Sequence, residues 1–264
     1  MSLICCVSSG KGGVGKTLSS VYFAISLKKA GKSVLIIDGD VGLSNVDVVL
    51  GIRPTYNILD VLEGRVNPMD ALAEGPHGLK VLHGGSGIAQ LSNLMEAEKL
   101  MLYSHIKSLA DNFDVTIIDA GAGISPTVIE MNRISDLRIV VTTPESHAMT
   151  DAYALIKMMT EARLASPISL LINQSRTPDE GDRAFSRIAD VSEKFLGIRP
   201  YFLGSVPSDP QIPALLRQRS AGTSYSLQTV AGSAWAKISH KFSEALSEPM
   251  VRVNVPSLGH NLEY

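Results

Sequence analysis

The sequence predicts an α/β protein with a mostly parallel sheet of about seven or eight strands and helices on both faces. Three observations predict this fold: short hydrophobic runs, longer helical patterns that alternate with them, and a glycine-rich segment after the first run. The runs are nearly continuous in apolar residues, as in strands that helices cover on both sides. Repeated strand–helix units favour a doubly wound sheet.

The expected strands are short, apolar and spread along the whole chain. They comprise residues 3–9, 33–38, 79–85, 115–121, 137–143, 168–174 and 201–207. Cys5 and Cys6 are neighbours on the first strand, so their side chains should point to opposite faces. We therefore expect two buried thiols rather than a disulfide or a metal site.

Helical patterns fill most of the segments between these strands. The expected helices comprise residues 17–30, 93–110, 150–164, 179–196 and 222–246. The first ends at Gly31, and the third begins with Thr150 as its cap. A capping box from Ser44 to Asp47 predicts one further short helix.

The chain shows no convincing linker, repeat or low-complexity tract, so we expect residues 1–264 to form a single domain. Residues 51–78 contain several turn signals and are expected to form a surface excursion with short helices. The tail from about residue 249 has no strong period, and we expect it to be extended.

The composition excludes several classes of protein. Of the 264 residues, 45% are hydrophobic and 19% are charged, which is ordinary for a soluble globular protein. The net charge of -2 gives no strong overall attraction to nucleic acid or anionic lipid. The two cysteines fit a reducing cytosol, and the six histidines show no metal-ligand spacing. The sequence has neither a signal peptide nor an apolar run of about 20 residues that could span a membrane.

The segment from Gly10 to Thr17 reads GKGGVGKT and matches the phosphate-loop pattern G-x-x-x-x-G-K-[ST]. Glycines let successive backbone N–H groups point into one concavity, and the following helix adds its positive end. Lys16 can reach the β- and γ-phosphates, and the Thr17 hydroxyl can bind Mg²⁺. These features predict a P-loop NTPase with ATP or ADP and Mg²⁺ as cofactors. The expected phosphate-binding residues are Gly12, Gly13, Val14, Gly15, Lys16, Thr17 and Leu18.

Lys11 is a second lysine in the same loop. By pattern alone it occupies a variable position, and a solvated side chain is the simplest interpretation. The whole string, however, resembles the deviant P-loop of the MinD/ParA family, K-G-G-x-G-K-[ST]. The resemblance implies that Lys11 reaches across a nucleotide-sandwiched homodimer into the partner's site. There it would add positive charge where the transition state accumulates negative charge, as an arginine finger does.

Asp38 and Asp40 lie at and just beyond the end of a strand, where ligands bind in open α/β sheets. Residues 34–51 resemble the string D-x-D-x-G-L-x-N-x-D-x-x-L-G of MinD and its flagellar relatives. The resemblance implies that Asp40 orients the attacking water and that Asp38 lies near the metal. Without the resemblance, Asp40 could be only a strand-end cap. We prefer the functional interpretation, because two carboxylates near a phosphate site need a metal ion or a lysine to offset their repulsion.

Asp119 ends a further apolar strand, as a Walker B aspartate should, and is expected to hold Mg²⁺ with Thr17 and Asp38. Gly121 and Gly123 permit a switch loop that senses the γ-phosphate. Relatives often have Thr or Ser where this chain has Ala120, so any contact from that hydroxyl is absent here.

Three residues are candidates for base recognition. Asn173 ends a strand and matches the family asparagine that reads adenine. Pro207 and Asp209 lie in a loop that matches the segment on the other side of the base. Ordinary strand-end turn chemistry is an equal alternative for this loop.

The resemblance covers nearly the whole chain and favours the flagellar number regulators, the FlhG/FleN/YlxH-like branch. The string TDAYALIK at 150–157 is close to text in that branch. Members often carry a leader that stimulates a GTPase of the signal-recognition type. The first strand here starts at residue 3, so we expect no leader. Members also tend to end in a membrane-targeting helix, but the apolar positions between Leu227 and Leu246 favour a face that docks on the sheet.

The resemblance therefore implies a cytoplasmic ATPase that dimerises with ATP and controls the placement or number of a cellular assembly, most plausibly flagella. The implied partners are a second copy of the chain and a flagellar GTPase, a flagellar switch or C-ring component, or a transcription regulator. A membrane surface is a further candidate partner, with the ATP-bound protein peripheral at its inner face.

Two alternatives come from other functional classes. A ParA-like partition ATPase would need a basic surface, and its thin candidate is the set Arg217, Arg219, Lys237 and Lys241. DNA is therefore not an expected partner. An iron–sulfur carrier of the same fold would need cysteines near the switch loops. Because both cysteines lie in the first strand, we set this alternative aside.

Overall fold

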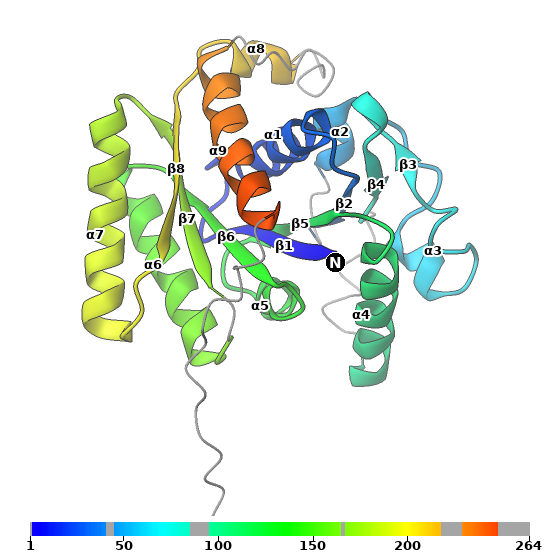
Figure 1. The fold of residues 1–264 in the computed structure, drawn as a ribbon. Coiled ribbons are helices and arrows are strands. Elements are labelled where there is room, and N and C mark those ends of the chain that lie inside the picture. Colours follow the sequence, from blue (N-terminus) through cyan, green and yellow to red (C-terminus); the bar gives the residue numbers. More distant parts are fainter. Residues whose placement is uncertain (1, 41–44, 85–94, 165–166, 218–228, 248–264) are drawn as a thin grey trace, which may run out of the picture.

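A computed structural model describes residues 2–40, 45–84, 95–164, 167–217 and 229–247 (Figure 1). Its centre is an eight-stranded sheet with the order β3-β4-β2-β5-β1-β6-β7-β8. The strands are β1 (Leu3–Ser9), β2 (Val34–Gly39), β3 (Ala73–Glu74), β4 (Lys80–Leu82), β5 (Val115–Ala122), β6 (Leu137–Thr142), β7 (Ile168–Ser175) and β8 (Tyr201–Pro207). All neighbouring strands are parallel except β3 and β4. The predicted fold class is confirmed.

The seven predicted strands correspond to every strand of this sheet except β3. The missed strand has two residues, Ala73 and Glu74, and pairs antiparallel with β4. A pair of residues carries no hydrophobic period, so its strand conformation depends entirely on the neighbour to which it bonds.

The helices lie between successive strands, except α8 and α9, which follow β8. They are α1 (Lys16–Lys29), α2 (Val46–Leu50), α3 (Ile58–Leu62), the 3₁₀ turn η1 (Pro76–Gly78), α4 (Glu96–Ala110), α5 (Pro126–Arg133), α6 (Ser146–Glu161), α7 (Pro178–Leu196), α8 (Ile212–Arg217) and α9 (Val230–Ser247). The predicted starts of the second and last long helices, at residues 93 and 222, lie outside the described residues.

One predicted helix cap is wrong, and another involves a residue outside the described part of the chain. Helix α6 begins four residues before Thr150, whose hydroxyl donates within the helix to the Ser146 carbonyl over 3.0 Å. Helix α2 has Asn45 as its N-cap, whose side chain makes no capping hydrogen bond, whereas Ser44, where the predicted capping box begins, lies outside the described residues. The first turn of α2 is instead capped from a strand, because Val46 N–H donates to Asp38 Oδ2 over 3.1 Å.

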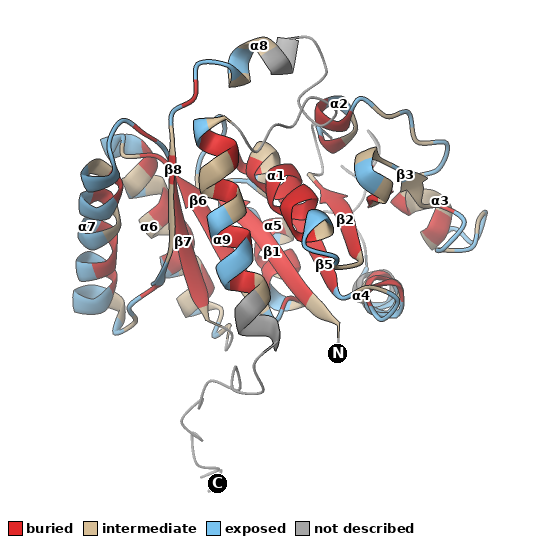
Figure 2. Cartoon of the chain, turned by 45° about the horizontal axis from the view of Figure 1, so that its top comes forward, coloured by how far each residue is buried: buried red, intermediate tan, exposed pale blue. Residues whose placement is uncertain are grey.

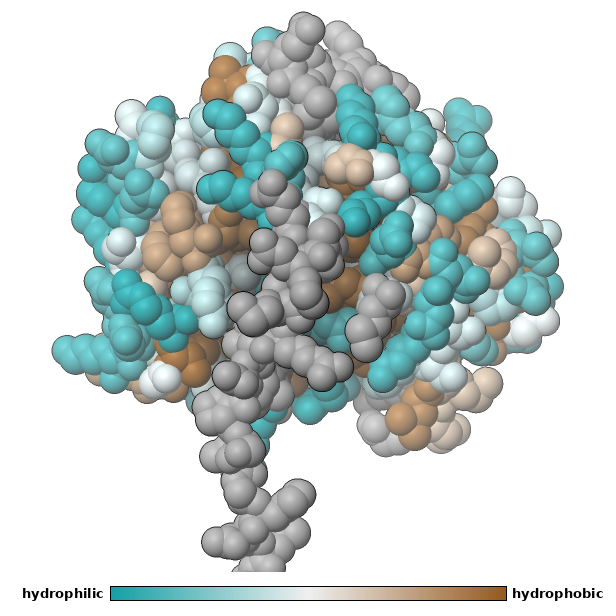
Figure 3. All heavy atoms as spheres, viewed as in Figure 1, coloured by the Kyte–Doolittle hydropathy of each residue, from teal (hydrophilic) through white to brown (hydrophobic). Residues whose placement is uncertain are grey.

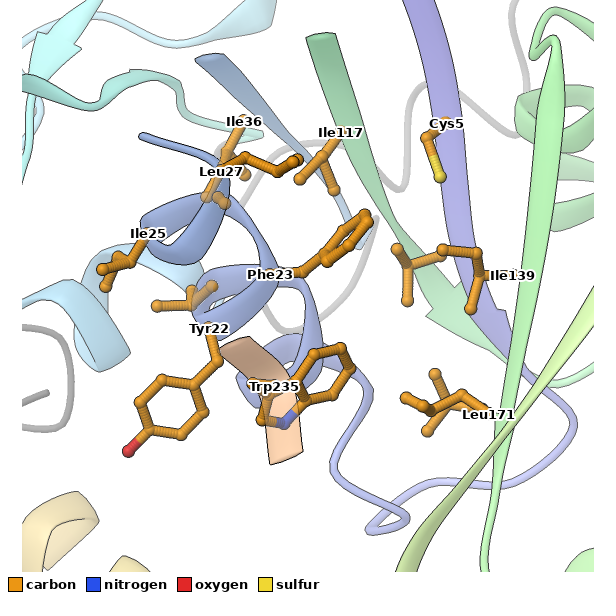
Figure 4. Packing of buried hydrophobic residues seen from close by; sticks show 14 of the residues in the cluster. Cys5, Tyr22, Phe23, Ile25, Leu27, Ile36, Ile117, Ile139, Leu171 and Trp235 are labelled. Atoms are coloured by element: carbon orange, nitrogen blue, oxygen red, sulfur yellow. The ribbon is translucent and has the colours of Figure 1, made fainter. Parts of the chain in front are cut away.

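Helices cover both faces of the sheet (Figure 2). Helices α1, α2 and α9 pack on one face, and α4 to α7 pack on the other. On the first face, Phe23 of α1 points at the strands beside Trp235 of α9 (Figure 4). The Phe23 ring lies 6.1 Å from Trp235 and 4.9 Å from Phe242 between ring centroids. The apolar face of α9 therefore docks on the sheet, as predicted.

Cys5 and Cys6 are both fully buried and free. Cys5 belongs to the hydrophobic cluster under α1, whereas Cys6 belongs to the cluster under α4 on the opposite face. Burial raises the pKa of the Cys6 thiol to about 12, and burial also raises the pKa of Cys5. The prediction of two buried, unlinked thiols is confirmed.

Candidate functional site

The glycine-rich loop joins β1 to α1 at the carboxyl edge of the sheet. β1 lies between β5 and β6, and the chain passes from β5 on one side to β6 on the other. In open α/β sheets, ligands bind where the direction of strand addition changes in this way. The topology therefore places the loop at the expected ligand site.

Close contacts require glycine at two positions of this loop, and Gly13 also has a positive φ of 81°. Gly15 has a φ of 86°, and a Cβ there would lie 2.3 Å from Asn173 Nδ2. A Cβ on Gly10 would lie 2.0 Å from the backbone oxygen of Asp151, because the loop begins directly against α6. Gly12 and Gly13 form the exposed part of the loop. The loop thus has its shape because two glycines admit close backbone approaches.

Lys16 lies at the start of α1 with only 6% of its surface exposed. Its Nζ lies 3.0 Å from Asp119 Oδ1 and 3.5 Å from Thr17 Oγ1. Ser20, one turn further along α1, donates to the same Asp119 oxygen over 2.7 Å. Sequence reasoning missed Ser20, although its position four residues after Lys16 puts it on the same helix face. The fold thus joins the P-loop lysine directly to the predicted Walker B aspartate.

The donor set next to Lys16 suits Mg²⁺. Asp119 is fully buried, and its Oδ2 has no hydrogen-bond partner. Thr17 supplies a hydroxyl that lies close to the same ammonium group. Carboxylate and hydroxyl oxygens are the ligands that Mg²⁺ takes alongside nucleotide phosphates. Thr17 and Asp119 therefore fit the metal site that the motif predicts.

Asp38 is the penultimate residue of β2, and Asp40 directly follows that strand. Asp38 is fully buried, and its Oδ1 accepts a hydrogen bond from Asp40 N–H over 3.2 Å. On the neighbouring strand, Asp119 is the Cα partner of Asp38. The Asp40 carboxylate lies beside the end of β5, since a Cβ on Gly121 would be 3.7 Å from Asp40 Oδ1. Both aspartates thus lie at the same sheet edge as the loop.

Lys11 is held at the surface by its own chain. Its Nζ lies 3.8 Å from Glu145 Oε2, and the two side chains are 43% and 73% exposed. Glu145 is the N-cap residue of α6, and sequence reasoning did not single it out. Exposed ion pairs of this kind contribute at most about 1 kcal/mol. Lys11 can therefore leave Glu145 at little energetic cost.

Asn173 contacts the loop itself. Its Nδ2 donates to the Val14 carbonyl oxygen over 2.8 Å, and the residue is 7% exposed. The next residue, Gln174, has a φ of 58°, a backbone conformation that often marks functional positions. The side chains of Val14 and Leu18 pack into the hydrophobic cluster, so only their backbones can face a ligand.

Pro207 and Asp209 lie at and just beyond the end of the neighbouring strand, β8. Pro207 ends β8 and is the Cα partner of Ser175 on β7. Asp209 is 7% exposed, and its carboxylate accepts hydrogen bonds from Gln211 N–H and from Ala231 N–H of α9. This carboxylate therefore ties the loop after β8 to the start of α9.

Proteins that place a glycine loop, a buried lysine and a strand-end aspartate at this point of a parallel sheet bind nucleoside triphosphates. Fold and site together define a P-loop NTPase. The ParA family model, described as "NUBPL iron-transfer P-loop NTPase", matches residues 1–243, and the chain belongs to this family. Iron–sulfur ligation would need accessible thiolates, whereas both cysteines of this chain are buried in β1.

Similar proteins of known name include regulators of flagella and of cell division. The chain is 34% identical to the antiactivator FleN of Pseudomonas aeruginosa over 81% of this chain and 77% of FleN. It is 33% identical to the flagellum site-determining protein YlxH of Helicobacter pylori over 81% of this chain and 72% of YlxH. It is 36% identical to the septum site-determining protein MinD of Bacillus subtilis over 78% and 76%.

Solved structures agree with this family. The cell division ATPase MinD of Pyrococcus furiosus has 27% identity and a TM-score of 0.76, over 93% of this chain and 100% of that chain. A MinC:MinD cell division protein complex from Aquifex aeolicus has 25% identity and a TM-score of 0.76, over 92% and 96%. The chain is thus a nucleotide-binding ATPase of the MinD/ParA type, as the sequence predicted.

The helices and the surface can be compared with the features expected of a membrane-spanning segment. Within the described part of the chain, no helix combines the length and apolar character needed to cross a bilayer. On the face in Figure 3, hydrophobic areas are interrupted by hydrophilic residues.

Proposed function

We propose that ATP drives two copies of this chain into a face-to-face homodimer and that hydrolysis releases them, which controls the placement or number of flagella. The observation that carries the flagellar assignment is the 33% identity to a flagellum site-determining protein over most of both chains. The similarity to FleN supports the same assignment. Residues 1–264 act as one ATPase domain in this proposal.

The loop and α1 hold the phosphates. Backbone N–H groups from Gly12 to Leu18 donate to phosphate oxygens, and the Lys16 ammonium exchanges its contact with Asp119 for the β- and γ-phosphates. Thr17 and Asp119, with Asp38 on the adjacent strand, would hold Mg²⁺. When bound, Mg²⁺ neutralises negative charge on the phosphates. The orphaned Asp119 Oδ2 supports this role, because it is a buried acceptor without a donor.

Asp40 and Lys11 complete the catalytic group. Asp40 lies at the sheet edge beside Gly121, where its carboxylate can orient a water for attack on the γ-phosphate. Lys11 leaves its exposed contact with Glu145 and enters the partner's site, where its ammonium stabilises the charge of the transition state. The low energetic cost of leaving Glu145 supports this role in trans.

Residues at the ends of β7 and β8 would recognise adenine. Asn173 lies directly against the loop, so its amide is within reach of a base held beyond the phosphates. Pro207 and Asp209 approach from the adjacent strand and would flank the other side of that base. The backbone contacts of Asp209 keep this loop in position.

Three variants separate the proposed roles. Lys16→Ala should lose nucleotide binding, and Lys11→Ala should bind ATP as a monomer with poor turnover. Asp40→Ala should accumulate as an ATP-bound dimer. Light scattering with ATP, together with phosphate release, measures these states. The matched control is Lys157→Ala, since Lys157 makes a similar exposed pair with Glu161 over 3.7 Å. Dimerisation and turnover of Lys11→Ala at the rate of this control would disprove the role in trans.

The flagellar output needs a test in cells. Deleting the gene should change the number or position of flagella, counted by electron microscopy. The intact gene should restore the normal pattern, whereas the Lys16→Ala gene should not. An unchanged flagellar pattern in the deletion strain would remove this part of the proposal and leave the ATPase mechanism untouched.

The proposed partners follow from the same assignment. They are a flagellar GTPase, a flagellar switch or C-ring component, or a transcription regulator. In this proposal the ATPase itself is cytoplasmic and attaches to the inner face of the membrane when ATP is bound. A pull-down from cell extract with and without ATP tests them. We expect one such protein to be enriched with ATP and lost with Lys16→Ala.

The second candidate function is ParA-like partition of DNA or other cargo. It is favoured by Lys237 and Lys241, which lie on one face of α9 and line a cavity of about 480 Å³ beside β8. Arg219 lies outside the described residues. A DNA-binding dimer would show ATP-dependent binding that weakens steeply with salt. If the ATP-bound protein does not bind DNA at low salt, this candidate is excluded.

A further inference from the structure

Three neighbouring strands each place one polar side chain at the same edge and on the same face of the sheet. Asp119 on β5 and Asp38 on β2 are Cα partners, and His83 follows β4 in the register set by Ile37 and Leu82. Two residues earlier on each strand, the side chains pack under α1; these are Ile117, Ile36 and Val81. Since side chains alternate along a strand, Asp119, Asp38 and His83 point to this same face.

The row of side chains formed by Asp119, Asp38 and His83 divides into two groups. Asp119 is engaged by Lys16 and Ser20 of α1. Asp38 and His83 instead meet Asp47, which lies in the first turn of α2. One potential ligand atom from each of these three residues lies within 4.8 Å of the other two. Asp47 and His83 therefore extend the row beyond the residues that contact Lys16.

The second group contains a buried acceptor without a donor. Asp38 is fully buried, and its two oxygens already accept hydrogen bonds from backbone N–H groups. Asp47 Oδ1 is buried and has no hydrogen-bond partner. A buried carboxylate oxygen without a donor costs free energy unless a cation or proton compensates for it.

We propose that Asp38, Asp47 and His83 form a second divalent-cation site, suited to a first-row transition-metal ion from Mn²⁺ to Zn²⁺. One imidazole and two carboxylates form a ligand set that such ions accept, whereas Mg²⁺ prefers oxygen ligands alone. Ligands about 2.1 Å from one ion are at most about 4.2 Å apart. Even the outer limit of 4.8 Å would therefore need to close by only about 0.6 Å.

The ion would join three elements that meet at one edge of the sheet. It would tie the start of α2 to the ends of β2 and β4, close to the loop that carries Asp40. The bound ion should therefore raise the unfolding temperature of the nucleotide-free protein. The site shares Asp38 with the proposed Mg²⁺ site, whereas Asp47 and His83 belong to the second site alone. Substitutions of Asp47 and His83 therefore test the second site separately from the proposed ATPase mechanism.

Cobalt titration of the full chain without nucleotide tests the site. Co²⁺ replaces the other ions in this experiment, and its visible absorption spectrum depends on the ligands that bind it. We expect one equivalent to bind, with displacement by Zn²⁺. His83→Gln and Asp47→Asn should each weaken binding at least about tenfold. His77→Gln is the matched control, because His77 is an exposed histidine near the same strand. Thr17→Ala should also leave Co²⁺ binding unchanged, since it alters only the P-loop.

The outcomes decide between a built site and chance binding. Loss of the Co²⁺ signal in His83→Gln and Asp47→Asn, with retention in the two controls, supports the site. Circular dichroism establishes that all the variants are folded, and binding of an ATP analogue confirms this for His83→Gln, Asp47→Asn and His77→Gln. No Co²⁺ binding, equal binding by all variants, or loss only in Thr17→Ala would each overturn the proposal. Because ATP turnover is not measured, failure of the ATPase proposal would not change this result.

Discussion

The buried ion pair of Lys16 and Asp119 predicts that the P-loop lysine stabilises the nucleotide-free fold in addition to binding phosphate. Lys16→Met removes the ammonium group and keeps an apolar stem of similar length. Asp119, fully buried, would then retain only the 2.7 Å hydrogen bond from Ser20. A buried carboxylate without a counter-charge is strongly unfavourable.

The magnitude follows from the separation of the charges. At 3.0 Å and an effective dielectric constant of about 20, the attraction is roughly 5 kcal/mol, before the cost of desolvation. Removing one partner of a buried pair typically costs about 3–5 kcal/mol. For a chain of this size each kcal/mol lowers the melting temperature by about 2–4 °C, so we expect a loss of at least about 6 °C.

A double-mutant cycle isolates the pair. Lys16→Met combined with Asp119→Asn removes both charges, and we expect it to recover about 2 kcal/mol relative to additive single losses. Urea unfolding in EDTA without nucleotide, followed by circular dichroism, measures all four proteins. The control is Lys11→Met, which breaks an exposed pair and should change stability by less than about 1 kcal/mol. Equal effects of Lys16→Met and Lys11→Met, or simple additivity in the cycle, would refute the reasoning.

Two further predictions concern the loop and the thiols. Gly15→Ala should cost about 2–3 kcal/mol and weaken nucleotide binding, because Ala is strained at a φ of 86° and its Cβ would displace Asn173. Gly12→Ala, with nothing within 4 Å of its Cβ, should leave stability nearly unchanged, and similar losses in both variants would contradict the loop geometry. Burial raises the pKa of Cys6 to about 12, so its stabilising contribution is complete below the unfolded-state pKa of about 8.5 and is lost as the pH rises toward 12. Unfolding measured from pH 8.5 to 10 should therefore show a steeper decline in the wild type than in Cys6→Ala, by about 2 kcal/mol over this range; parallel curves would count against a buried neutral thiol.

The elements of the fold could largely be predicted from local patterns. Among the described residues, apolar runs and helical periods predicted seven of the eight strands and every helix of more than ten residues. The failures were local and had physical causes. Thr150 has the chemistry of a cap, but its hydroxyl bonds inside α6. The cap of α2 could not be predicted because its acceptor, Asp38, belongs to another element.

The sequence by itself determined the α/β fold, the phosphate loop and the family, because these depend on residue types at short, regular spacings. Only the tertiary structure decided which side chains meet. Lys16 and Asp119 are 103 residues apart, and Asn173 and Val14 are 159 apart. The strand order brings Lys16 to Asp119, and the register aligns Asp38 with Asp119 and His83. Strand order and register arise from the packing of the whole sheet, which no short segment of sequence encodes.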